Sequence, residues 1–335
     1  MTELTSDPTS DPHGDAAGGV EFTTVTNGDI TLEVAVKGAG PLIVFVHGWP
    51  ELWYSWRHQI DHVAARGYRA AALNVRGYGN SSNPTEIERY TMRELTGDVA
   101  AVIDALGDGP AVVVGHDWGA PIAWNTARLY PDKVRAAVGL SVPYLPIGPV
   151  STIDIFRELF QDRFFYQLYF QQPGVAEAEL SADNARSLRM IYFGASVDGV
   201  GTFLTDKAPE ATMLEGMVDP DPLPSWITAD DIALYAAAYD VSGWHGPINR
   251  YRAQGLDAAD IGQTEHPGLA QPAAFIGGEA DPVRDFVDGI DLFDRAADAC
   301  LDFRGATIVP GAGHWVQQEQ PAATNAALDA FLDSL

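Results

Sequence analysis

The chain has 335 residues with 46 acidic and 20 basic side chains, so its formal net charge is −26. This much negative charge repels phosphate backbones and anionic lipid headgroups, which proteins bind through Lys and Arg, and we therefore expect neither nucleic acid nor a membrane as a partner. Hydrophobic residues make up 46% of the chain, which excludes disorder as its main state, and its single cysteine, Cys300, excludes an internal disulfide and a cysteine-based zinc site.

The N-terminal residues 1–19 are rich in Thr, Ser, Asp, Pro and Gly. They lack both the basic start and the apolar stretch of a secretory signal. No apolar run in the chain approaches the roughly 18 residues that span a bilayer. We predict a disordered tail on a cytoplasmic protein.

Beyond the tail, apolar strand-like runs alternate with helix-like segments. The strand-like runs are residues 42–46, 68–73, 111–115, 134–141, 273–277 and 306–309. Near-continuous apolar runs of this length are typical of parallel strands that helices cover on both faces. The pattern predicts an α/β fold with a mostly parallel central sheet.

The alternation stops between residues 146 and 262, where Phe, Tyr and Leu recur at helical spacing among Pro and Gly residues. Strand signals return only at Ala273. We predict a helical cap over residues 146–262, inserted into a core made of residues 20–145 and 263–335. We expect the cap to cover the carboxyl end of the sheet, where open α/β sheets bind their ligands.

Residues 111–121, AVVVGHDWGAP, carry the pattern Gly-x-Asp-x-Gly between a predicted strand and a predicted helix. In a nucleophile elbow, small flanking residues permit a strained turn that projects the central side chain, here Asp117. A helix N-cap is the alternative interpretation of this Asp. A carboxylate nucleophile forms an ordinary ester when it attacks a saturated carbon that carries a leaving group. The helix N-terminus favours an anion, so we expect Asp117 to stay ionised.

Groups that could hydrolyse such an ester follow other predicted strands. His314, in the loop GAGHW, is a candidate base for water and is expected to titrate near the ordinary His pKa of about 6.5. Asp281, in GGEADP, is suited to orient His314. A lone His is more often structural, and Asp before Pro is an ordinary turn signal. The chain order nucleophile, acid, His is nevertheless the order of elbow folds.

Two backbone N–H groups are candidates for an oxyanion hole. Trp49 follows the first strong strand-like run in the motif HGWP, for which a simple turn is the alternative, and Trp118 directly follows the nucleophile. Elbow folds have their donors at these two points. His116, next to Asp117, is expected to point away from the site.

No spacing of His, Cys and carboxylates indicates a metal site, and we expect no cofactor.

These residues together resemble the α/β-hydrolase superfamily, and the aspartate narrows the resemblance to epoxide hydrolases and haloalkane dehalogenases. Residues 164–180, FFYQLYFQQPGVAEAEL, look very like the cap segment of soluble epoxide hydrolases, and residues 246–252, GPINRYR, resemble the second cap motif of that family. The resemblance extends from about Val20 to the C-terminus. It implies that Tyr166 and Tyr251 bind the epoxide oxygen and protonate it; packing is the alternative for any single Tyr of an aromatic-rich cap.

The chain departs from the family pattern at three positions. The family usually has Phe where Trp49 stands, Trp where Arg250 stands, and often Asp where Asn74 stands. None of these changes removes a catalytic group, but Trp49 is expected to narrow the pocket beside Asp117. The expected substrate-binding residues are Trp49, Trp118, Tyr166 and Tyr251.

The resemblance implies an epoxide hydrolase that converts a small apolar epoxide and water into a vicinal diol through a covalent aspartyl ester, as in detoxification. A haloalkane dehalogenase is the alternative enzyme, since Trp118 is shared with that family, where it helps to bind halide. A catalytically silent, ligand-binding α/β-hydrolase is the alternative from another class, because fold alone does not fix function. The sequence leaves open which epoxide is the substrate and whether the protein is a homodimer.

Overall fold

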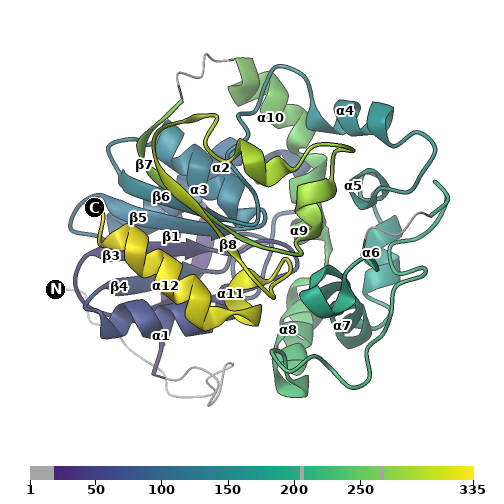
Figure 1. Ribbon diagram of the computed structural model, residues 1–335, viewed down its shortest axis with the longest axis horizontal. Coiled ribbons are helices and arrows are strands. Elements are labelled where there is room, and N and C mark those ends of the chain that lie inside the picture. The colour runs from purple at the N-terminus through teal and green to yellow at the C-terminus, as the bar shows by residue number, and fades with distance from the viewer. Residues whose placement is uncertain (1–18, 204–206, 264–267) are drawn as a thin grey trace.

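The computed structural model describes residues 19–203, 207–263 and 268–335. The strands of these residues form one eight-stranded sheet in the order β1-β2-β4-β3-β5-β6-β7-β8 (Figure 1). The strands are β1 (Glu21–Asn27), β2 (Ile30–Gly38), β3 (Leu42–Val46), β4 (Arg69–Leu73), β5 (Ala111–His116), β6 (Val134–Leu140), β7 (Leu269–Gly278) and β8 (Cys300–Val309). The predicted tail, residues 1–19, lies outside the described residues apart from Gly19.

Strands β3 to β8 form the parallel part of the sheet, whereas β1 and β2 join it antiparallel at one edge. The six predicted strands correspond to β3 to β8, so the prediction of an α/β fold with a mostly parallel sheet is confirmed. β1 and β2 were not predicted from the sequence. Many residues of these two strands are polar and partly or fully exposed, because an antiparallel edge can face water on one side. A search for continuous apolar runs passes over such strands.

Four long helices cover the two faces of the sheet (Figure 1). α1 (Arg57–Ala65) and α12 (Pro321–Leu332) lie on one face, and α2 (Met92–Leu106) and α3 (Gly119–Leu129) lie on the other. Every residue of β3 and β5 is buried between these layers. The loops that leave the carboxyl ends of these strands therefore start from a close-packed base.

In their described part, residues 146–262 contain only helical secondary structure, and the chain leaves the sheet after β6 and returns to it at β7. Most of these helices lie together beside the sheet, to its right in Figure 1. They are α4 (Thr152–Leu159), α5 (Tyr166–Tyr169), α6 (Val175–Leu180), α7 (Asn184–Ala195), η4 (Val197–Gly199), α8 (Ala229–Ser242), α9 (His245–Arg252) and α10 (Gln254–Asp260). We refer to residues 146–262 as the cap. None of the helices in the described residues is long and apolar enough to cross a membrane.

Short helical turns occupy several of the connecting loops. They are η2 (Trp53–Trp56), η3 (Ile87–Tyr90), η5 (Ile261–Gln263), η6 (Pro282–Asp285), η7 (Leu292–Arg295) and the four-residue α11 (Val316–Glu319). The turns η2, η6 and α11 follow β3, β7 and β8 respectively, so they begin close to the carboxyl end of the sheet.

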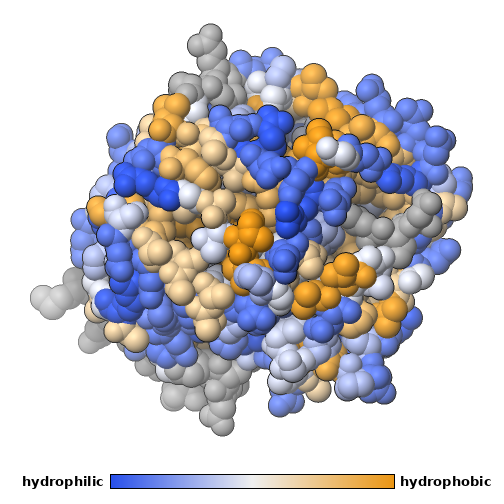
Figure 2. Space-filling model, viewed as in Figure 1, coloured by the Kyte–Doolittle hydropathy of each residue, from blue (hydrophilic) through white to orange (hydrophobic). Residues whose placement is uncertain are grey.

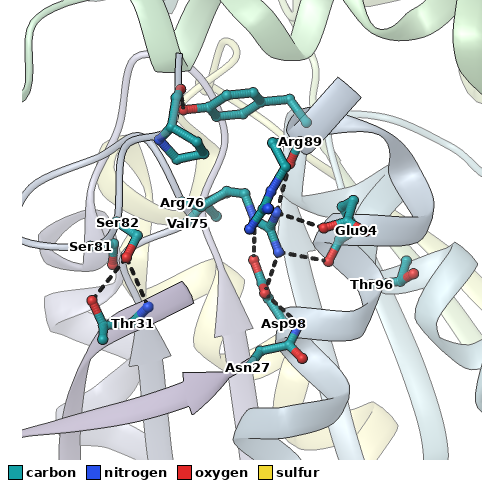
Figure 3. A network of polar contacts seen from close by, with 12 residues as sticks. Asn27, Thr31, Val75, Arg76, Ser81, Ser82, Arg89, Glu94, Thr96 and Asp98 are labelled. Carbon is teal, nitrogen blue, oxygen red and sulfur yellow. Dashed lines mark hydrogen bonds and ion pairs between the residues drawn. The ribbon is translucent and has the colours of Figure 1, made fainter. Parts of the chain in front are cut away.

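A buried ion-pair network anchors the loop that follows β4 (Figure 3). The fully buried side chain of Arg76 makes two hydrogen bonds of 2.6 Å to Asp98 and one of 2.9 Å to Glu94, both on α2. Asn27, the last residue of β1, donates to the same Asp98 carboxylate at 2.9 Å. The network joins the edge of the sheet, this loop and α2 into one unit.

Candidate active site

Asp117 occupies a strained turn between β5 and α3. Its backbone φ is +50°, in the left-handed region that non-glycine residues rarely adopt. The two glycines around it are required by sterics: a Cβ at Gly115 would lie 1.9 Å from the Gly119 carbonyl oxygen, and a Cβ at Gly119 would lie 1.9 Å from that of Val46. The pattern Gly-x-Asp-x-Gly therefore provides the room that this turn needs.

The Asp117 carboxylate lies between a backbone donor and an imidazole. Trp49 donates its N–H to Oδ1 at 2.7 Å, and His314 Nε2 lies 3.4 Å from Oδ2. Trp118 follows as the N-cap residue of α3. Burial alone would raise the pKa of Asp117, but the hydrogen bond and charge of His314, aided by the Trp49 N–H, lower it below its usual value. The carboxylate is therefore ionised, as expected from the sequence.

His314 and Asp281 meet in the loops that follow β8 and β7. His314 Nδ1 lies 3.1 and 3.2 Å from the two Asp281 carboxylate oxygens. Burial alone would lower the pKa of His314, but the charge of Asp281 and the hydrogen bonds to Asp117 and Asp281 raise it well above its usual value of 6.5. The expectation that His314 titrates near 6.5 is wrong for the free protein, because two carboxylates face one ring.

Tyr166 on α5 and Tyr251 on α9 line the same small cavity as Asp117 and His314. Their side chains are 7% and 1% exposed, and their ring centroids are 5.8 Å apart. Tyr166 accepts a hydrogen bond of 3.1 Å from the side chain of Gln167. Burial, with a contribution from the charge of Asp117, raises the pKa of both hydroxyls above the usual value. Both are neutral phenols that can donate a proton.

The Trp49 indole fills the space between these groups. Its ring centroid lies 6.4 Å from that of Tyr166 and 6.0 Å from that of Tyr251, and the residue is 3% exposed. The cavity that Trp49 lines together with Asp117 and His314 measures about 20 Å³. This volume accommodates about one water molecule.

A larger cavity of about 250 Å³ also reaches Asp117, Trp118 and Tyr166. Most of its other walls are apolar and include Trp124, Val142, Ile147, Phe156, Phe286 and Leu292. Mainly apolar walls with a few convergent polar groups are typical of small-molecule sites. The space suits an apolar substrate of modest size.

Arg250, which stands where the family usually has Trp, forms part of the wall of this larger cavity. Its guanidinium lies 4.6 Å from the ring centroid of Trp118, pairs with Asp257 and donates to the Tyr90 carbonyl at 2.6 Å. Because Asp257 balances its charge, Arg250 provides a flat polar surface against Trp118 rather than a binding site for an anion.

Glu51, which was not predicted from the sequence, is a fully buried carboxylate beneath the site. Oε2 of Glu51 accepts a hydrogen bond of 3.0 Å from the Gly48 N–H and lies 2.6 Å from Nδ1 of His116. The other ring nitrogen of His116, Nε2, lies 2.7 Å from the His314 carbonyl oxygen. Each nitrogen of the His116 ring thus lies beside an acceptor oxygen. Glu51 and His116 together link the HGWP loop to the His314 loop. No local pattern marks Glu51, which directly follows a motif that also fits a simple turn.

Within residues 19–203, 207–263 and 268–335, no group of three or more His, Cys, Asp or Glu side chains is arranged to hold a metal ion.

Known proteins are similar to this chain in sequence and in architecture. The alpha/beta hydrolase fold family matches residues 41–321. Epoxide hydrolase A of Mycobacterium tuberculosis is 40% identical over 320 residues, which cover 92% of this chain and 96% of that protein. Epoxide hydrolase 2 of Siraitia grosvenorii is 36% identical over 324 residues, which cover 93% of this chain and 98% of that protein. A solved structure of an epoxide hydrolase from an endophytic Streptomyces matches with a TM-score of 0.89 at 39% identity, covering 94% of this chain and 96% of that one. The chain therefore belongs to the α/β-hydrolase fold family and, within it, to the epoxide hydrolases.

Proposed function

We propose that the protein hydrolyses apolar epoxides to vicinal diols through a covalent ester on Asp117. The observation that carries this proposal is the meeting of an ionised Asp117, the imidazole of His314 and the neutral hydroxyls of Tyr166 and Tyr251 at one small cavity. An epoxide carbon is a saturated electrophile that suits a carboxylate nucleophile. Its oxygen leaves as an alkoxide and needs a proton, which a phenol can supply.

Ring opening uses the Asp117 oxygen that faces His314 and is not bound by the Trp49 N–H. Oδ1 is held by the Trp49 N–H, so Oδ2 attacks the epoxide carbon while the carbon–oxygen bond of the ring breaks. Tyr166 and Tyr251 bind the ring oxygen, and one of them transfers its proton to the alkoxide. The products of this step are a hydroxyalkyl ester of Asp117 and a phenolate, which recovers its proton in the second step.

Ester hydrolysis uses His314 as the base. A water in the small cavity gives a proton to His314 and attacks Cγ of Asp117, and the negative charge that develops on Oδ1 is stabilised by the N–H groups of Trp49 and Trp118. Asp281 holds the ring in the tautomer that accepts this proton. The bond between Cγ and Oδ2 then breaks, and His314 returns its proton to the departing alkoxide, so that the diol leaves. Asp117 is left as a carboxylic acid, gives its proton to the tyrosine phenolate and is a carboxylate again.

Labelled water tests the ester route. A single turnover of excess enzyme on a styrene-type epoxide in heavy-oxygen water should give unlabelled diol and label in the Asp117 peptide, both read by mass spectrometry. Label found directly in the diol would mean that water attacks the ring and that Asp117 acts as a base. Under the proposed route, the variant His314→Gln accumulates the ester, which is visible as an adduct in the intact mass.

Haloalkane dehalogenation is the second candidate, favoured by the position of Trp118 beside Asp117 in the larger cavity. A halide needs N–H donors, whereas the two tyrosine hydroxyls suit an oxygen leaving group. Halide release from a panel of chloroalkanes, measured beside epoxide turnover, separates the two activities. Tight epoxide binding without diol or adduct would instead indicate a silent, ligand-binding member of the family.

We further propose residues 146–262 as a cap that folds onto a core of residues 20–145 and 263–335. A cytoplasmic location and a homodimer remain predictions, which cell fractionation and analytical ultracentrifugation would test.

A further inference from the structure

Glu319, the last residue of α11, is a buried carboxylate that takes no part in the two chemical steps above. Three backbone N–H groups donate to it, each at 2.9 Å: those of Val197 and Gly313 to Oε2, and that of Trp315 to Oε1. Burial raises the pKa of Glu319 to about 7 in spite of these donors. Burying a carboxylate costs free energy. We therefore attribute the presence of Glu319 here to the backbone segments that its three hydrogen bonds join.

Two of the three donors flank His314. The backbone of His314 is itself fixed on both sides: its N–H donates to the Ala195 carbonyl at 2.9 Å, and its carbonyl accepts from Ser141 Oγ at 2.8 Å. There is no free space beside it, because a Cβ at Gly313 would lie 2.5 Å from the Val197 nitrogen. The His314 loop is therefore packed directly against residues 195–197.

The third donor, Val197, belongs to the cap, where it begins η4 two residues after the end of α7. A second link lies close by, since the Trp315 indole donates to the Tyr192 carbonyl on α7 at 2.7 Å. Oε2 of Glu319 thus binds one N–H from the cap and one from the His314 loop. The proton donors Tyr166 and Tyr251 also belong to the cap, so this contact joins the part that carries the acids to the part that carries the base.

We propose that Glu319 is a positioning residue that fixes the His314 loop against the cap and thereby supports ester hydrolysis. The proposal rests on the proposed function, in which His314 activates the hydrolytic water. The base must stay within hydrogen-bond reach of a water that also reaches Cγ of Asp117, and a displacement of about 1 Å can cost about 100-fold in rate. Ring opening does not use His314 as a base, so it should depend far less on Glu319.

The variant Glu319→Gln tests this division. Gln has the same shape but only one acceptor oxygen, so at least one of the three backbone donors faces an NH₂ group. In single turnovers followed by intact mass, we expect ring opening to stay within about twofold of wild type and ester hydrolysis to slow at least about 10-fold. Ester should therefore accumulate in the steady state. A matched control is Glu279→Gln. Glu279 is an exposed carboxylate that lies 3.4 Å from the Gly311 N–H of the same loop. Its replacement by Gln should change neither rate.

A second variant breaks the link to the cap while Glu319 stays in place in the sequence. Val197→Pro lacks the N–H that Glu319 accepts, and its Cδ stands where that N–H points and displaces Oε2 of Glu319. The backbone suits Pro because Val197 is the first residue of η4 and follows Ser196 in an extended conformation (φ −80°, ψ 169°). Loss of one hydrogen bond should slow ester hydrolysis by about threefold or more. Val197→Ala keeps the N–H and should hydrolyse the ester at the wild-type rate.

The outcomes are distinguishable. If Glu319→Gln slows both steps equally, or neither, the positioning role is wrong. If wild type and variants make diol without any ester, the proposed function fails instead. Thermal unfolding shows whether each variant is folded, and Val197→Pro, in which Glu319 is intact, decides the question if Glu319→Gln does not fold.

Discussion

The charge of Asp117 controls the basicity of His314. In the free protein, Asp117 and Asp281 both face the ring and raise the pKa of His314, so the ring is protonated and pairs with the nucleophile. In the proposed reaction Asp117 becomes a neutral ester, which removes one of the two charges, so the pKa of His314 should fall. The ring would then become a base at the step that needs one.

The variant Asp117→Asn imitates the neutral ester. Because it removes one negative charge and leaves Asp281 in place, the pKa of His314 should fall by about one unit or more relative to wild type. The imidazole Cε1–H signal in an NMR titration measures this shift, with His314→Gln used for assignment. Asp329→Asn, which removes a carboxylate that contacts His62 instead, is the control. An unchanged pKa in Asp117→Asn would contradict the coupling.

The two cap tyrosines should share the work of protonation. Replacing Tyr166 or Tyr251 by Phe should slow ring opening by about 10- to 100-fold, and replacing both should slow it by more than about 1000-fold, because the alkoxide then has no acid. Rapid quench of ester formation measures this rate. Tyr169→Phe is the matched control, because Tyr169 lies on the same helix as Tyr166 but its hydroxyl donates to Glu179. A double variant with undiminished ring opening would exclude the proposed acid role.

At the scale of elements, two ion pairs join α2 to Arg76 in the loop after β4, and they contribute unequally to stability. The Asp98 side chain is 2% exposed where it meets Arg76, whereas the Glu94 side chain is 41% exposed. A buried pair that loses one partner leaves an uncompensated charge in a medium of low polarity. When an exposed pair loses one partner, water solvates the remaining charge, so the loss of stability is small.

Asp98→Ala should therefore lower the free energy of unfolding by about 3–5 kcal/mol, because it leaves the buried Arg76 without its main partner. Glu94→Gln should lower it by less than about 1 kcal/mol. Equilibrium urea unfolding of the two variants, which change the same Arg76 network, gives both values. Equal losses would show that burial does not set the strength of these pairs.

The carboxyl ends of parallel strands meet at one edge of a sheet, and this geometry makes part of the site predictable. Trp49, Asp117, Asp281 and His314 each follow a strand that was recognised from its apolar run, so their proximity could be inferred from the sequence. β1 and β2 could not be recognised in the same way, because their half-exposed residues resemble a polar loop.

The rest of the site depends on contacts between distant segments. Tyr166 and Tyr251 are two among many cap aromatics, and only the resemblance to a family distinguished them. Glu51 and Glu319 bind backbone N–H groups that approach them only in the folded chain. In the run Gln317-Gln318-Glu319, no periodicity indicates which side chain faces the His314 loop.

At the scale of the whole molecule, the net charge of −26 is the dominant electrostatic feature. Hydrophilic residues cover much of the face drawn in Figure 2, and apolar residues appear there as separate groups. Many of the ion pairs are exposed and contribute little, so they do not offset the mutual repulsion of the excess carboxylates.

Salt should therefore stabilise the protein. Raising sodium chloride from about 10 mM to about 0.5 M shortens the screening length from about 30 Å to under about 8 Å and weakens this repulsion. We expect Tm to rise by several degrees, measured by circular dichroism at pH 7, with potassium chloride giving the same result. A Tm that falls with salt would mean that attractive pairs dominate the surface.

The division between inserted helices and sheet loops has a consequence for how such an enzyme changes over time. The proposed proton donors for ring opening come from a stretch of chain inserted at a single point, between β6 and β7, whereas the proposed nucleophile and hydrolytic base come from the surrounding chain. The two half-reactions are thus encoded in separable lengths of sequence. Exchange of the insert would alter which epoxides are opened and at which carbon. The proposed ester chemistry would be retained where a new insert keeps the contacts with the His314 loop that Tyr192, Ala195 and Val197 now make.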